Sequence, residues 1–181
     1  MSIQEIVTKR RTIHHYKPVA VDESIIDEAL RLVVHAPNHH LTFPYHFYKV
    51  KGDVRSALLQ YAYDSFAVKS KETADQKIQK WSNIPGWLLV TQKRGAEPKV
   101  TKEDYATISI AMYILMLALD ERGIGSKWST ASLFETEKWY EICGVDADKE
   151  EIVGMLWYGY TDKEPKTFAR PSMDQYCSTL E

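Results

Sequence analysis

The sequence predicts an α+β fold, with one central sheet, helices on its faces and one long helix buried in the core. Three observations lead to this fold class. Short segments rich in aromatic and β-branched residues, typical of strands, stand at 45–51, 87–93 and 151–160. Longer segments between them carry apolar residues at helical spacing. Finally, residues 105–119 contain no charged side chain, which is typical of a helix that is buried on all sides.

Length and composition place the chain among ordinary globular proteins. It has 181 residues, 44% of them hydrophobic and 27% charged, so we expect one domain, 1–181, with a core of its own. The formal net charge of −2 gives no overall field that would attract nucleic acid or an anionic membrane. Two cysteines argue against a disulfide framework, and the first residues contain no apolar signal core. We therefore expect a cytoplasmic protein.

The first helix is expected to begin after Asp22, whose carboxylate can cap the free backbone N–H groups. Apolar residues then recur at helical spacing over 25–33. Pro37 disfavours a helical conformation for the residue before it, so this helix should end near His35. The elements expected next are a strand at 45–51, helices at 54–70 and 74–82, and a strand at 87–93.

The charge-free segment 105–119 predicts the strongest helix of the chain. Thr101 is expected to cap it, with Asp104 three residues later as in a capping box. The segment is shorter than the ~20 residues that cross a bilayer, so it should be a core helix. Because a helix that is apolar all round needs partners on every side, we expect part of it to lie in a subunit interface.

Two glycines, Gly123 and Gly125, are expected to end this helix. The remaining elements predicted are a loop at 125–130, a helix at 136–144 closed by Gly144, a buried strand at 151–160 and an extended polar tail at 161–176.

Histidines gather in two polar clusters, "RRTIHH" at 10–15 and "HAPNHH" at 35–40. A metal site is one interpretation, but no cysteine or carboxylate pair stands at the spacing of a zinc site. His39 and His40 are also neighbours, and neighbouring side chains point apart in an extended chain. We therefore predict no metal ligands.

A second interpretation of these clusters is an anion site built from side chains. Glycine-rich phosphate loops, dinucleotide fingerprints and the serine hydrolase elbow are all missing from the sequence. Arg10, Arg11 and Thr12 offer planar donors and a hydroxyl that suit a phosphate, and Lys166 and Arg170 add charge from the tail. The alternative is a solvated basic surface, and the residues alone leave both possibilities open.

Four motifs, in their order along the chain, resemble those of the nitroreductase family, in particular its small members. They are "KRRTIHHYKP", "APNHHLTFPYHF", "EDYATISIAMYILMLALDERGIGSKW" and "GYTDKEPKTFARP", and together they span nearly the whole chain. The resemblance implies an α+β nitroreductase-like fold with a central mixed sheet flanked by helices. It also implies a homodimer with two FMN molecules in the subunit interface, each of them touched by both subunits.

The resemblance assigns a role in FMN binding to several residues. Arg10, Arg11 and Thr12 match the opening triplet of the family, which holds the FMN phosphate and ribityl chain. Arg170 matches a C-terminal arginine that reaches the same phosphate.

Further flavin contacts are implied at the second and third motifs. His35 and His39 fall where small members of the family contact the flavin, with His39 serving the flavin of the partner subunit. Trp128, Ser129 and Thr130 match the segment that runs along the flavin.

This sequence departs from the family pattern beside the flavin. His14 replaces a basic residue near the pyrimidine end of the ring, and a histidine is mostly neutral at pH 7. Phe43 and Tyr45 replace a glutamine and a tryptophan, so an amide is lost. These changes bear on flavin tuning and on substrate choice.

The activity implied by the resemblance is that of an FMN-dependent oxidoreductase. NADH or NADPH would deliver hydride to flavin N5, and an electron-poor acceptor such as a nitroaromatic or a quinone would then take its place. The cofactor carries this chemistry, so we expect no protein acid or nucleophile. Two alternatives stay open: a flavin-binding storage or sensor protein without efficient turnover, and a metal-dependent protein that uses the histidines.

Overall fold

The structure, a computed structural model, describes residues 2–95 and 97–180. Its centre is a four-stranded sheet in the order β1-β2-β4-β3, and each neighbouring pair is antiparallel. In the described ranges, the parallel part of the expected mixed sheet is one isolated bridge, between Thr12 and Ser126. The strands are β1 (Tyr45–Lys49), β2 (Gly86–Lys93), β3 (Gly125–Ser129) and β4 (Glu150–Gly159).

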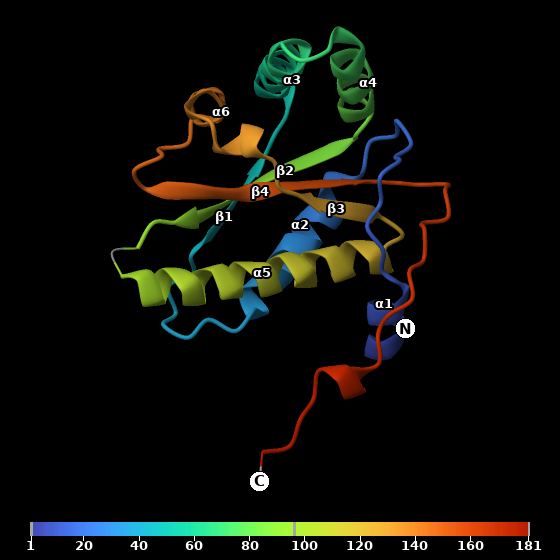
Figure 1. Ribbon diagram of the computed structural model, residues 1–181, viewed down its shortest axis with the longest axis vertical. Helices are drawn as coiled ribbons and strands as arrows, with labels where there is room; N and C mark the ends of the chain where they lie inside the picture. Colours follow the sequence, from blue (N-terminus) through green and yellow to red (C-terminus); the bar gives the residue numbers. More distant parts are fainter. Residues whose placement is uncertain (1, 96, 181) are drawn as a thin grey trace.

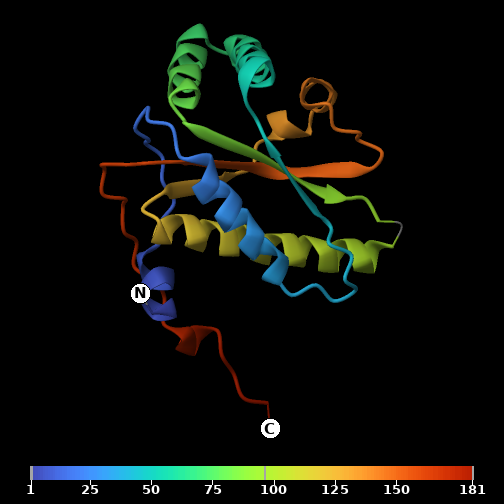
Figure 2. The ribbon, with the colours of Figure 1, turned by 180° about the vertical axis from the view of Figure 1, so that it is seen from behind.

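Helices cover both faces of this sheet (Figure 1). One face carries α3, α4 and α6, and the other carries α2 and α5, as the view from behind also shows (Figure 2). The tail after β4 leaves the sheet and runs past α1. The helices are α1 (Ile3–Lys9), α2 (Glu23–Leu32), α3 (Gly52–Ala67), α4 (Lys71–Ser82), α5 (Pro98–Glu121) and α6 (Glu137–Cys143), with 3₁₀ turns at Val33–His35, Ser132–Glu135 and Met173–Gln175.

Alternation along the central strands divides the interior into two cores. Leu88 and Leu156 pack among the residues of α2 and α5 on one face. Trp87 and Trp157, each one position away along its strand, pack among the residues of α3 and α6 on the other. Because side chains alternate between the faces of a strand, the apolar runs in β2 and β4 supply both cores at once.

The long helix α5 is a core helix, as the sequence predicted. Its inner face is buried against the sheet and α2, and its outer face remains partly exposed and apolar. There Tyr105 and Ile110 are exposed, and a shallow apolar groove of about 220 Å³ runs between α5 and α1. Among the residues described, no helix is both long and apolar enough to span a membrane.

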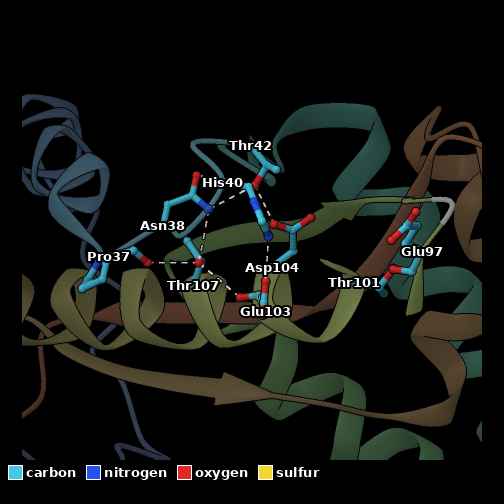
Figure 3. Close-up of polar contacts among 9 residues, drawn as sticks. All are labelled: Pro37, Asn38, His40, Thr42, Glu97, Thr101, Glu103, Asp104 and Thr107. Carbon is cyan, nitrogen blue, oxygen red and sulfur yellow. Dashed lines mark hydrogen bonds and ion pairs between the residues drawn. The ribbon is translucent and has the colours of Figure 1, made fainter. Parts of the chain in front are cut away.

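The prediction that Thr101 caps α5 was wrong. The helix already begins at Pro98, a residue whose fixed φ angle favours the first helical position. Thr101 lies inside the first turn, and its hydroxyl donates to the carbonyl of Glu97 at 3.1 Å. Asp104 is buried and accepts a hydrogen bond from the Thr42 hydroxyl at 2.5 Å, so it holds a loop instead of a helix end (Figure 3).

The loop expected at 125–130 is largely the strand β3. Its backbone pairs with β4 in a register from Gly125 opposite Gly159 to Ser129 opposite Met155. Glycine and serine indicated a loop locally, whereas pairing with the central strand decides the observed conformation. The helix α1 was not predicted, although Ser2 and Glu5 form the capping box that begins it.

The other helices and strands lie where the sequence predicted them, with ends that differ by up to three residues. Gly125, however, begins β3 and does not end α5. Asp22 caps α2 through the backbone N–H of Ser24. A 3₁₀ turn then carries the chain to His35, where the helical segment was expected to end. At the other end of the chain, Gly144 closes α6 in the left-handed conformation at φ 66°.

Gly154 should be the glycine of β4 that is least tolerant of a side chain. Its φ angle is +148°, and an added Cβ would lie 2.6 Å from the carbonyl oxygen of Ser129 and 2.8 Å from Nε1 of Trp128. We expect Gly154→Ala to lower the free energy of unfolding by more than ~2 kcal/mol, from steric overlap and backbone strain together. Urea denaturation followed by circular dichroism measures this loss.

Gly123→Ala is the matched control for Gly154→Ala. Gly123 also has a positive φ, +74°, but an added Cβ would meet nothing within 4 Å. Backbone strain alone predicts a loss of ~1 kcal/mol there. Equal losses in the two variants would contradict close packing of β3 on Gly154.

Candidate functional site

The segment that follows α1 is attached to the free edge of β3. Thr12 bridges to Ser126 in parallel, and the N–H of Ile13 donates to the carbonyl of Ser126 at 3.1 Å. Ile13 is buried, whereas its neighbours Thr12 and His14 are exposed. This attachment therefore presents alternate polar side chains of the segment to the solvent.

The tail after β4 returns beside the same segment (Figures 1 and 2). The N–H of Lys17 donates to the carbonyl of Tyr160 at 2.8 Å, which fixes the start of the tail. Between the two segments lies a cavity of about 700 Å³. Its lining is Arg10, Arg11, Thr12, Ile13, His14, His15, Thr161, Lys163, Glu164, Pro165, Lys166, Phe168 and Arg170.

Positive charge dominates this cavity, although the chain as a whole is slightly acidic. Arg10 has a buried Nε without a hydrogen-bond partner, and its guanidinium lies 5.8 Å from the centre of the Tyr113 ring. Among the described residues, Arg11 donates through Nη1 to two backbone carbonyls, those of Thr8 and Arg10, at 2.5 and 2.8 Å. Carbonyls orient the guanidinium but do not neutralise it, so both arginines suit a multiply charged anion such as a phosphate.

Asp120, near the end of α5, is the acidic neighbour of the arginines. Burial raises the pKa of its carboxyl group, and the charges of Lys9, Arg10 and Arg11 act in the opposite direction. Its Oδ2 is buried without a hydrogen-bond partner. The carboxylate thus offsets part of the positive charge from the protein side and leaves the cavity itself basic.

His14 is more readily neutral than an ordinary histidine. Partial burial lowers its pKa from 6.5, and the positive charges of Lys127 and His15 lower it further. Lys127 is half-buried in β3, with its Nζ 5.0 Å from the centre of the Trp157 ring. Burial lowers the pKa of Lys127 as well. At neutral pH the His14 position therefore carries little charge of its own.

Three of the predicted residues lie on β3 and directly after it, outside the basic cavity. Trp128 is half-buried over Gly154, and its Nε1 is buried without a hydrogen-bond partner. Ser129 is buried and Thr130 is exposed. They continue the strand to which the N-terminal segment is attached, so they share its edge of the sheet.

The two predicted histidines of the second cluster lie elsewhere. His35 ends the 3₁₀ turn after α2, and His39 lines a separate groove of about 530 Å³ along α5. One chain therefore brings Arg10, Arg11, Thr12, His14 and Arg170 together, and it does not bring His35 or His39 to them.

Sequence reasoning missed Lys127 and most of the tail lining. Lys127 was overlooked because its segment was expected to be a loop, and only the register with Trp157 places it. Lys163 and Phe168 carry no sequence signal beyond their place near Arg170. The regular recurrence of basic residues along the tail was the sequence feature that pointed to a basic lining.

Comparison with known proteins assigns this chain to a family. The sequence model of the Nitroreductase family matches residues 7–160. The chain belongs to the nitroreductase family. Its relative YfhC of Bacillus subtilis (strain 168), a proposed NAD(P)H nitroreductase, is 28% identical over 180 residues, which are 96% of this chain and 92% of that protein.

Solved structures of the nitroreductase family have the same fold. The crystal structure of a nitroreductase-like family protein from Bacillus cereus matches with a TM-score of 0.91 and 25% identity, covering all of this chain and 97% of that one. FMN-dependent nitroreductase NfnB from Mycobacterium smegmatis, in complex with NADPH, matches with a TM-score of 0.77 and 15% identity over 98% of this chain and 97% of that one. The nitroreductase-like α+β fold expected from the four motifs is confirmed.

Proposed function

We propose that this member of the nitroreductase family is an FMN-dependent oxidoreductase that carries hydride from NADH or NADPH to nitroaromatics, quinones or similar electron-poor acceptors. The observation that carries the proposal is the basic cavity, where Arg10, Arg11 and Arg170 face one space and Arg10 has a buried, unpartnered Nε. Its volume is in the range of cofactor pockets. The descriptions of two relatives support the proposal: YfhC is a proposed NAD(P)H nitroreductase, and NfnB is an FMN-dependent nitroreductase.

The side chains of this cavity fit a flavin phosphate. Arg10, Arg11 and Arg170 would bind the phosphate oxygens, and the Thr12 hydroxyl would donate to the phosphate or the ribityl chain. Trp128, Ser129 and Thr130 would run along the ring. Bound FMN would supply the hydride chemistry, and the protein would supply orientation and electrostatics.

A homodimer would complete the site. His35 and His39 lie apart from the cavity of their own chain. This separation supports the proposal that His39 serves the flavin of the partner subunit. The partly exposed apolar face of α5 and the groove beside α1 offer a surface for such a dimer. Without a second copy to cover it, this face would leave apolar surface exposed to water, which is unfavourable.

A storage or sensor protein is the second candidate. It is favoured by the mostly neutral His14 and by Phe43, which is nearly half exposed where the family has an amide. Both changes remove groups that would tune the flavin for turnover.

We also propose a cytoplasmic location, from the two cysteines. Both are free in the structure. Cys143 is a structural thiol, because burial raises its pKa to about 12.

The purified protein should be a yellow homodimer with about one FMN per chain, since each cavity would hold one phosphate. Light scattering gives the mass, and flavin extraction gives the stoichiometry. NADH or NADPH should bleach the flavin band under anaerobic conditions. A bound flavin that neither donor bleaches would favour the storage alternative, and a colourless monomer that cannot be reconstituted would contradict both.

Arg10→Ala and Arg170→Ala should each weaken FMN binding. Loss of one partner of a buried charge pair costs roughly 2–5 kcal/mol, or tens- to thousands-fold in affinity. The loss should be smaller for Arg170, which is exposed, than for the half-buried Arg10. Riboflavin lacks the phosphate, so its affinity should change little. Arg31→Ala, at an exposed arginine of α2, is the control. Fluorescence titration of FMN and riboflavin into the wild type and the three variants measures these affinities. Unchanged FMN affinity in both cavity variants would mean that the basic residues are solvated surface residues that do not bind the phosphate.

His14→Arg should raise the flavin midpoint potential at pH 8, because reduced flavin carries negative charge that a fixed cation stabilises. If one partly solvated charge stabilises the reduced flavin by ~1.4 kcal/mol, the midpoint potential rises by ~30 mV for a two-electron couple. The lowered pKa of His14 means that the wild type gains this charge only as the pH falls below 6.5, where the two potentials should converge. Potentiometric titration tests this, and coincident potentials at pH 8 would place His14 away from the ring.

A further inference from the structure

Two neighbouring histidines and a glutamate converge beside α5, outside the basic cavity. The ligand atoms of His39, His40 and Glu103 all lie within 4.8 Å of one another. The histidine rings are 4.3 Å apart between centroids and inclined by 66°. The expectation that these two side chains point apart was wrong, because they lie in a turn and not in an extended strand.

The contact between His40 and Glu103 differs from an ordinary hydrogen bond. Nε2 of His40 lies 3.0 Å from Oε2 of Glu103 (Figure 3). That oxygen is nevertheless buried and has no hydrogen-bond partner, so the close approach lacks hydrogen-bond geometry. Two electron-pair donors this close to each other are arranged as they would be around a cation.

A polar network fixes the turn that carries the histidines (Figure 3). The Asn38 amide oxygen accepts from the N–H of Phe43 at 2.8 Å, and the Thr42 hydroxyl donates to Asp104 on α5. Thr107, also on α5, donates to the carbonyl of Pro37 at 3.0 Å. These bonds fix the backbone of the turn from which both histidines project.

The same turn holds strained backbone. Leu41 and Phe43 have φ angles of +50° and +43°, a region that costs a residue other than glycine ~1–3 kcal/mol. Such strain persists only where the surroundings impose it, and it gathers at functional sites. The network to Asp104 and Thr107 is what imposes it here.

The cluster is accessible from solvent. His39 and Glu103 both line the groove of about 530 Å³ along α5, so an ion could enter and keep a water ligand. In tetrahedral zinc sites with bonds of ~2.0–2.1 Å, neighbouring ligand atoms lie roughly 3.4 Å apart. The 3.0 Å pair is slightly closer than this spacing and the remaining ligand atoms lie within 4.8 Å, so small rotations of the partly exposed side chains can bring all three to it.

We propose that His39, His40 and Glu103 form a Zn²⁺ site with two histidine ligands, one carboxylate and an open fourth position. This ligand set is one that zinc accepts. All three ligands come from one chain, so a single chain is enough to form the site. His39 is also proposed to contact the flavin of the partner subunit, so Zn²⁺ would compete with that contact. The alternative is a half-exposed His40–Glu103 ion pair, which contributes ~0–1 kcal/mol to the stability of the fold and binds no metal.

Metal titration of the full-length protein tests the site, after chelator dialysis and removal of any flavin, because His39 is also proposed to contact the flavin of the partner subunit. Calorimetry should show one Zn²⁺ per chain, and Co²⁺ should give visible bands of a low-coordinate ion that Zn²⁺ abolishes. His40→Ala and Glu103→Gln should each weaken Zn²⁺ binding by at least about tenfold, since loss of even a supporting group costs that much. His46→Ala, at an exposed histidine of β1, should bind as the wild type does.

A thermal melting measurement keeps the result decisive. Zn²⁺ should raise the melting temperature of the wild type but not that of Glu103→Gln, which preserves side-chain shape and so the fold. No zinc in the wild type, or equal zinc affinity in wild type, His40→Ala and Glu103→Gln, would overturn the site. His39 has a proposed part in flavin binding, so the variants are made at His40 and Glu103, which have none. Failure of zinc binding therefore leaves the oxidoreductase proposal standing, and a protein without flavin could still bind zinc.

Discussion

The parallel contact between the N-terminal segment and β3 is the constraint on which the basic cavity depends. Gly125 has no side chain, and an added Cβ would lie 2.5 Å from Cγ1 of Ile13. Ile13 can therefore be buried against the strand, and Thr12 beside it bridges to Ser126. Burial of this one isoleucine turns Thr12 and His14 outward, and the cavity forms on that side. The absence of a side chain at Gly125 thus decides that Thr12 and His14 point outward.

Local charge, and not net charge, describes what this protein can bind. The chain carries −2 overall, yet five of the cavity-lining side chains are basic and one is acidic. The net charge of the whole chain argues against a general affinity for polyanions. It carried no information about a site in which arginines are drawn together by a strand edge and a returning tail.

The sequence predicted elements where local pattern and tertiary packing agree. Helical spacing found α2, and Gly144 marked the end of α6 because no other residue takes that conformation as easily. It failed at 125–130, where backbone pairing with β4 outweighs a glycine and two serines. It also failed at Thr101, whose capping pattern lies one turn inside a helix that Pro98 had already begun.

Site residues were predictable to the extent that they lie on one continuous surface. The N-terminal arginines and Arg170 could be grouped from their chemistry, since a phosphate needs several donors at once. Lys127 needed the register of β3, which no local signal contains. The convergence of His39 with His40 needed the turn geometry, which periodicity does not describe.

The returning tail has an energetic consequence of its own. It supplies about half of the cavity lining, but most of its residues are exposed and bury little apolar area. With so little packing to hold it, opening the tail costs far less than unfolding the sheet. A phosphate bound between Arg10 and Arg170 would hold the tail against the N-terminal segment, so part of its binding free energy would be used to order the tail.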